Sequence, residues 1–64
     1  MAKYLIQSYN KEMTVLVEQV EKQYADDVDA LGAAYDVAQN ADIVILYRRN
    51  ETTPHYLKKI AKLY

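Results

Sequence analysis

The sequence predicts one α+β domain spanning residues 1–64, with the element order β-β-α-β-α and a three-stranded sheet. Three observations lead to this class. Strand-forming residues dominate the first third of the chain, small residues behind an acidic cap fill the middle, and the stretch that follows is apolar on both faces. In this prediction one helix packs on the sheet, and an amphipathic basic helix forms from the last residues.

Residues 3–9 are predicted as the first strand, because strand-forming side chains dominate them and no helix cap precedes them. Residues 12–20 fit two patterns, since their apolar side chains have both helical spacing and strand propensity. We expect a second strand here. A helix over residues 11–24 is the alternative, and it would give the order β-α-α-β-α.

Pairing across a two-residue loop at Asn10 and Lys11 favours the second strand. In that register Ile6 faces Val15, and along the hairpin apolar side chains meet apolar ones while opposite charges meet each other. The sequence therefore predicts a hairpin that turns at Asn10 and Lys11.

The predicted hairpin has two apolar sides. The side expected to receive the first helix carries Tyr4, Ile6, Val15 and Val17. The other side carries Leu5, Leu16 and Val20. This second side needs a cover, which the C-terminal helix, a partner protein or a second copy of the chain in a homodimer would supply.

Residues 26–40 are predicted to form a helix. Asp26 is a good N-cap, and Asp27 and Asp29 suit the first turn, where the positive end of the helix dipole favours acidic residues. Asn40 suits the C-terminal end. The apolar stripe expected to face the sheet consists of Val28, Leu31, Tyr35 and Ala38.

Residues 42–49 are apolar on both faces up to Tyr47, which is typical of a central strand that is covered on both sides. Thr53 and Pro54 then suit the cap and the first position of a second helix. The apolar side of this helix would carry Leu57, Ile60, Ala61 and Tyr64, and its basic side Lys58, Lys59 and Lys62.

Residues that could perform catalysis or hold a metal are missing or isolated. The chain has no cysteine and a single histidine, His55, so neither a disulfide nor a four-ligand zinc site is expected. Ser8 lies within a predicted strand without a histidine at a spacing that suggests a catalytic triad. The acidic residues near position 27 suit a helix terminus, and one glycine does not build a phosphate-binding loop. We therefore predict no catalytic residues, no metal and no cofactor.

The chain is expected to be cytoplasmic. Its longest apolar run, residues 43–47, is far shorter than the roughly 18 residues that a membrane span requires. The first residues also lack the apolar core of a secretory signal.

Charge is distributed unevenly along the sequence. Residues 1–42 hold three bases and eight acids, a net charge of −5, whereas residues 43–64 hold five bases and one acid, a net charge of +4. The chain also has seven tyrosines, whose apolar body and polar tip suit interfaces. The residues expected to contact a partner are Tyr47, Arg48, Arg49, Tyr56, Lys58, Lys59 and Lys62. A secondary acidic edge consists of Glu18, Glu21, Asp26 and Asp27.

These features predict a small non-enzymatic protein-binding module that blocks the working surface of its partner by steric and electrostatic contacts. The alternative is a nucleic-acid-binding protein. In it, the cations of the basic C-terminal strand and helix would meet phosphates, and the tyrosines would stack on bases.

The stretch YADDVDALGAAYDVAQNADIVILYRRN, preceded by a hairpin, is similar in layout to small phage-encoded proteins that disable host machinery. These include some anti-CRISPR proteins and inhibitors of bacterial RNA polymerase. The resemblance covers residues 3–50 and concerns the sequence of a hairpin, an acid-capped helix and a strand ending in arginine. It implies an inhibitor that occupies a surface of a host enzyme or complex in the host cytoplasm, and it assigns no functional residue.

Overall fold

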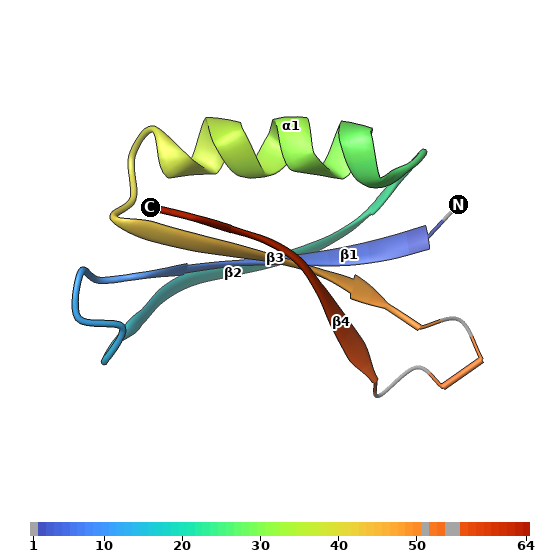
Figure 1. Ribbon diagram of the computed structural model, residues 1–64, viewed down its shortest axis with the longest axis horizontal. Helices are drawn as coiled ribbons and strands as arrows, with labels where there is room; N and C mark the ends of the chain where they lie inside the picture. Colours follow the sequence, from blue (N-terminus) through green and yellow to red (C-terminus); the bar gives the residue numbers. More distant parts are fainter. Residues whose placement is uncertain (1, 51, 54–55) are drawn as a thin grey trace.

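The structure, a computed structural model, describes residues 2–50, 52–53 and 56–64. Over these residues the chain is an α+β domain in which a four-stranded antiparallel sheet carries one helix on one face (Figure 1). The strands lie in the order β2-β1-β3-β4, so that β1 and β3 are the interior strands. The elements are β1 (Ala2–Tyr9), β2 (Leu16–Tyr24), α1 (Asp27–Ala38), β3 (Ile43–Arg49) and β4 (Leu57–Leu63).

The predicted order β-β-α-β-α is wrong at its last element, where a strand, β4, replaces the C-terminal helix and makes the sheet four-stranded. Leu46 lies opposite Ala61 and Tyr47 lies opposite Lys59, so Ile60 is an additional residue, a β-bulge. The bulge interrupts the two-residue alternation of the strand and gives the apolar residues of β4 a helix-like spacing. Pro54, predicted at the start of that helix, and His55 lie outside the described residues.

The predicted fold-back of residues 12–20 on the first strand is confirmed, whereas its register is wrong. The chain turns over residues 10–15 instead of over two residues, and Ile6 lies opposite Val20 instead of Val15. The alternative order β-α-α-β-α is wrong as well, because β2 is a strand of nine residues. Val15 and Val17, which were expected beneath the helix, are exposed.

The predicted central helix is confirmed as α1, with Asp26 as its N-cap. The Asp26 carboxylate accepts a hydrogen bond from the backbone N–H of Asp29 at 2.8 Å. The apolar stripe predicted to face the sheet is confirmed for Leu31 and Ala38, which pack against the core, and is wrong for Val28 and Tyr35, which are exposed. The fully buried residues of α1 are Ala30 and Ala34. Their small side chains let the helix lie close to the sheet, so the larger Val28 faces outward with 77% of its surface exposed.

The hydrophobic core lies between α1 and the helix-facing side of β1 and β3. Tyr4 and Ile6 of β1 pack there with Val44 and Leu46 of β3. The prediction that residues 42–49 form a central strand is confirmed, because β3 pairs with β1 on one side and with β4 on the other. Ile60 and two further residues of β4, Ala61 and Leu63, border this core.

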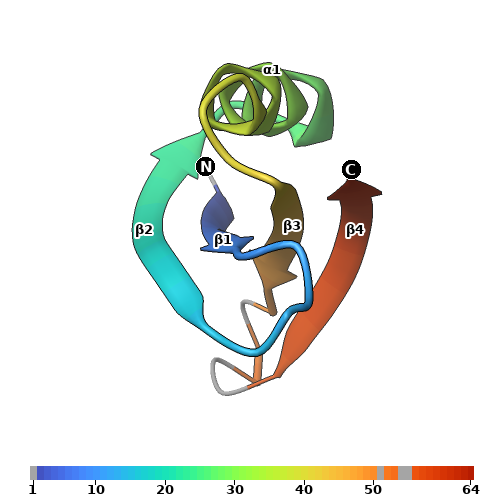
Figure 2. The ribbon, with the colours of Figure 1, turned by 90° about the vertical axis from the view of Figure 1, so that its left-hand side faces the viewer.

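Among the described residues, no helix lies on the opposite side of the sheet. Successive side chains of a strand point to opposite faces, so Leu5 and Ile45 lie on this helix-free side, and yet only 4% and 5% of their surfaces are exposed. An ion pair between Glu21 of β2 and Arg49 of β3 spans the intervening strand β1 on the same side. The edge strands also curve, and their ends point toward α1 in the view of Figure 2.

Candidate functional site

The most concentrated exposed apolar surface of the described chain lies where β1 turns into β2. Met13, Val15, Leu16 and Val17 are exposed by 36%, 55%, 46% and 66%, and together they form a group that we call the hairpin tip. Single exposed apolar residues are ordinary on protein surfaces, whereas a contiguous group marks a contact site. The hairpin tip is therefore the first candidate for binding a partner.

The side chain of Asn10 holds the backbone of this turn in one shape. Its Oδ1 accepts hydrogen bonds from the backbone N–H groups of Thr14 at 2.8 Å and Val15 at 3.0 Å, and its Nδ2 donates to the Thr14 hydroxyl at 2.9 Å. The backbone N–H of Met13 donates to the Asn10 carbonyl at 2.9 Å. An asparagine that bonds to backbone groups further along the chain is a recurrent way of fixing a turn. The apolar side chains that follow are thus presented from an ordered loop.

Met13 has a backbone φ of 58°, in the left-handed region. A residue with a Cβ atom pays an energetic penalty of about 1–2 kcal/mol in this conformation. Strained backbone of this kind persists only where surrounding contacts enforce it, and it is concentrated at binding and active sites. The bonds made by Asn10 supply that enforcement here.

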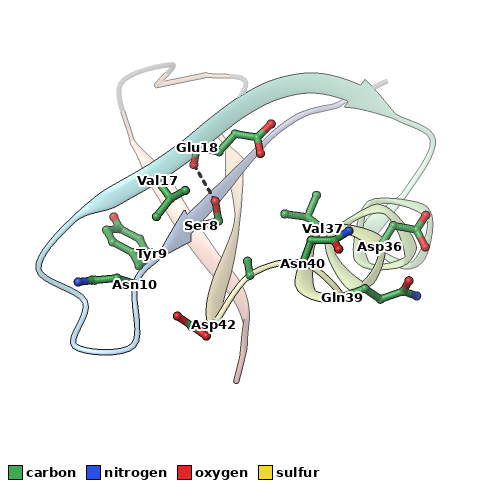
Figure 3. Close-up of a pocket in the computed structure, with 11 residues that line it drawn as sticks. Ser8, Tyr9, Asn10, Val17, Glu18, Asp36, Val37, Gln39, Asn40 and Asp42 are labelled. Carbon is green, nitrogen blue, oxygen red and sulfur yellow. Dashed lines mark hydrogen bonds between the residues drawn. The ribbon is translucent and has the colours of Figure 1, made fainter.

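A hollow of about 680 Å³ lies beside the hairpin tip, between the hairpin and the C-terminal end of α1 (Figure 3). Tyr9 and Val17 line it from the hairpin, and Val37 lines it from the helix. Ser8, at its back, is buried and donates a hydrogen bond from its hydroxyl to the Glu18 carbonyl at 3.4 Å. The apolar surface of the tip thus continues into a concave region.

The charged residues around the tip and the hollow are mostly acidic. Lys11 is the base of this region, and the acids are Glu12, Glu18, Asp36 and Asp42. The region therefore has a net charge of −3, and its apolar centre has an acidic rim. Glu18 was predicted as part of a secondary acidic edge, and it lies on this rim.

The residues predicted to contact a partner lie on or beside the β3–β4 hairpin but do not share one face. Side-chain alternation puts Arg48 and its opposite residue Lys58 on the side of α1. The remaining residues of β3 and β4 in the predicted set lie on the helix-free side and are Tyr47, Arg49, Lys59 and Lys62. Tyr56 lies in the turn, where it borders a small hollow of about 270 Å³ with Arg48, Arg49 and Lys58.

Two acidic residues of the predicted secondary edge are paired with the predicted basic residues. Asp27 lies 3.6 Å from the Arg48 guanidinium, and Glu21 accepts hydrogen bonds from Arg49, one of them at 3.2 Å. Hydrogen bonding to Arg49 holds the pKa of Glu21 below its ordinary value. Asp26, which also belongs to that predicted edge, is the N-cap of α1. The predicted basic and acidic sets are therefore partly one internal network.

The apolar side predicted to carry Leu5, Leu16 and Val20 does not form as one exposed surface. Leu5 is buried on the helix-free side, and Val20 lies opposite Ile6 on the side of α1. Leu16 alone of the three is exposed, as part of the hairpin tip. The sequence reasoning missed the tip because it paired residues 12–17 within the strand. The available signal was the uninterrupted apolar run Val15–Leu16–Val17, which one covered face of a strand cannot bury.

In the part of the chain that the structure describes, no helix has both the length and the apolar content to cross a membrane. Within the same residues, no group of three or more His, Cys, Asp or Glu side chains is placed to hold a metal ion. Comparisons with protein-family models, with curated proteins and with solved structures each gave no match.

Proposed function

We propose that this chain is a small non-enzymatic protein-binding module that docks by its hairpin tip. The observation that carries this proposal is the set of four exposed apolar side chains on and beside a loop held by Asn10. Apolar anchors at the centre of an interface supply most of its binding energy. A loop that is already ordered loses less conformational entropy when its partner binds.

The charges define the kind of partner. An apolar centre with an acidic rim fits a protein surface with an apolar depression and basic residues around it. Contact between two copies of the tip would bring two rims of net charge −3 together, which disfavours self-association by this surface. The expected partner is therefore a different protein.

The action we propose is the blocking of a host protein's working surface, as in the phage-encoded inhibitors that the chain resembles in layout. The hairpin, the acid-capped helix and the strand ending in arginine, on which that resemblance is based, are all present in the fold. A small domain with an exposed apolar tip suits steric blocking, because blocking needs no reacting groups and no conformational change.

Site-specific photo-crosslinking tests this function. A photoreactive residue is placed at Val17 in one protein and at Val28 in a second, since both valines are exposed, by 66% and 77%, but lie on different surfaces. Both proteins are produced and irradiated inside host cells. We expect a discrete crosslinked protein from position 17 and not from position 28. Equal products from both positions, or none from position 17, would contradict the proposal.

Titration of the crosslinked partner then measures the contribution of the tip. Val15→Asp and Val17→Asp should each weaken binding about tenfold or more, because a charge replaces an apolar anchor at the interface. Val28→Asp makes the same chemical change on α1 and should alter binding less than about twofold. Asn10→Ala leaves the apolar residues in place but frees the loop, and it should weaken binding by an intermediate factor. An equal loss in all four variants would point to general destabilisation and would refute the tip as the contact.

A further inference from the structure

The helix-free side of the sheet is basic, in contrast to the rest of the molecule. The strand registers place Lys3, Arg49, Lys59 and Lys62 on this side, with Glu21 as its acid, and we call this surface the basic face. These five residues have a net charge of +3, whereas the whole chain has a net charge of −1. The charge asymmetry seen along the sequence thus becomes an asymmetry between the two sides of the sheet.

The placement of these cations follows from side-chain alternation. Lys59 lies opposite Tyr47, and Lys62 lies opposite Ile45, whose side chain is on the helix-free side. Lys3 precedes Tyr4, which belongs to the core on the other side, and it lies close enough to Glu21 to lower the pKa of that carboxyl. The cations come from β1, β3 and β4, so they are spread across the sheet instead of lying along one strand.

Aromatic rings lie among the cations. Tyr9 and Tyr47 are half-buried on the interior strands of this side. Tyr64 is 89% exposed, and the Lys62 ammonium lies 5.1 Å from the centre of its ring. The aliphatic residues at the centre of the face, such as Leu5 and Ile45, are buried and offer no anchor. The accessible chemistry of the basic face is therefore cationic and aromatic.

We infer that the basic face binds single-stranded nucleic acid. Its cations match the phosphate backbone, and its tyrosine rings offer stacking surfaces for unpaired bases. The basic face is the broad side of a sheet and not a helix or ribbon that could enter the groove of a duplex, and the bases of a duplex are not free to stack on tyrosine. This inference does not depend on the hairpin tip, which has the opposite charge and adjoins this face at Tyr9.

Charge complementarity also fits an acidic protein, but the aliphatic centre of this face is already buried, which favours nucleic acid. A protein interface also uses tyrosine and arginine, but around an apolar centre, and the exposed aliphatic residues of this chain are concentrated at the hairpin tip. Stacking on tyrosine is tolerant of base identity, so binding without strong sequence preference is expected. With three or four phosphate contacts, the logarithm of the affinity should fall with the logarithm of the salt concentration with a slope of about −2 to −3.

Fluorescence anisotropy of the full chain with a labelled single-stranded oligonucleotide of about twelve nucleotides tests the inference. Binding measured at about 50 mM and about 200 mM salt should weaken by roughly 15- to 60-fold at the higher concentration. The same sequence as a duplex and a poly-glutamate peptide of similar charge should both bind at least about tenfold more weakly. No binding at the lower salt concentration, or poly-glutamate binding as tightly as the oligonucleotide, would overturn the inference.

Matched variants locate the site. Lys59→Glu on the basic face should weaken oligonucleotide binding about tenfold, whereas Lys22→Glu makes the same charge change at an exposed lysine on the helix side and should weaken it less than about threefold. Tyr64→Ala should weaken it about fivefold or more, and Tyr35→Ala, at a 55% exposed tyrosine of α1, should not. Equal losses within either pair would overturn the assignment to this face. Val17→Asp should leave oligonucleotide binding intact, which separates this site from the proposed protein-binding tip.

Discussion

The hydroxyl of Tyr4, on β1, donates a hydrogen bond to the carboxylate of Asp27 in the first turn of α1. Tyr4 is 1% exposed, and Asp27 also faces Arg48 of β3 at 3.6 Å. One carboxylate therefore ties the helix to both interior strands of the sheet. Because the fully buried residues of α1 are alanines, this polar link adds a fixed point that small side chains do not provide.

Replacing Tyr4 by Phe should lower the free energy of unfolding by about 1–2 kcal/mol at neutral pH, since the variant loses a hydrogen bond to a charged group while its ring still fills the core. Urea denaturation of both proteins measures the difference. An unchanged midpoint would show that water replaces the hydroxyl without cost.

Tyr4 should also make the fold sensitive to high pH. Burial, followed by the hydrogen bond to Asp27, raises the pKa of Tyr4 from 10.0 to about 12. The folded state favours the neutral phenol, so this stabilisation is complete below about pH 10 and is lost as the pH rises to about 12. The loss should amount to about 2 kcal/mol in the original protein and should be absent from Tyr4→Phe. If the free energies of unfolding of the two proteins fall equally over this pH range, Tyr4 does not have this role.

The ion pair between Glu21 and Arg49 should stabilise the fold less at low pH than at neutral pH. Because Arg49 lowers the pKa of Glu21, the pair stabilises the fold at pH values above the ordinary glutamate pKa of 4.5, and this is lost as the pH falls through the lower pKa of the folded state. Both side chains are about one-third exposed, so we expect a contribution of only about 0.5 kcal/mol. Glu21→Gln should remove this part of the acid sensitivity, as measured by thermal unfolding across the acid range. A variant with the same acid profile as the original protein would contradict it.

Met13→Gly should stabilise the protein relative to Met13→Ala by about 1 kcal/mol. Both variants remove the side chain, but glycine adopts the observed φ of 58° without steric cost. At most exposed positions the order of the two is reversed, because glycine has more freedom in the unfolded chain. Chemical denaturation decides between them, and a more stable alanine variant would show that the turn relaxes when the side chain is shortened.

Gly32→Ala should raise the free energy of unfolding by about 0.5–1 kcal/mol. Gly32 lies within α1 and is exposed, it has no positive φ, and an added Cβ would meet no atom within 4 Å. Ala34→Val is the matched contrast, because Ala34 is fully buried against the sheet. The added methyl groups should lower the free energy of unfolding by about 1–3 kcal/mol. Thermal unfolding of the two variants should therefore give shifts of opposite sign.

The sequence was sufficient to predict the elements that depend on residues within or next to them. Asp26, with the acidic residues after it, determined where α1 begins, since a cap bonds to the helix within three residues. The continuous apolar run of β3 correctly indicated an interior strand. Both features can be recognised from a short segment of the sequence without knowledge of its distant partners.

Long-range pairing decided the elements that were predicted wrongly. The bulge at Ile60 gives β4 the apolar spacing of a helix. The segment forms a strand because the backbone N–H and C=O groups at the edge of β3 would otherwise lack partners in the sheet. The hairpin register was decided by Asn10, whose side chain bonds to backbone groups four and five residues later and so replaces a two-residue turn by a longer one. The same turn exposes the hairpin tip, so an error in register also concealed the candidate site.

By itself, the sequence determined that this chain is an α+β protein with a β-hairpin, an acid-capped helix and an interior apolar strand, because those properties depend on local propensity and capping. The tertiary structure alone decided which side of each element is buried. In α1, which is apolar or small almost all around, the closeness of the sheet selected Ala30 and Ala34 over Val28 and Tyr35. It also decided that Lys3 joins the cations of β3 and β4, because only the pairing of β1 with β3 brings residues so distant in sequence onto one side of a sheet.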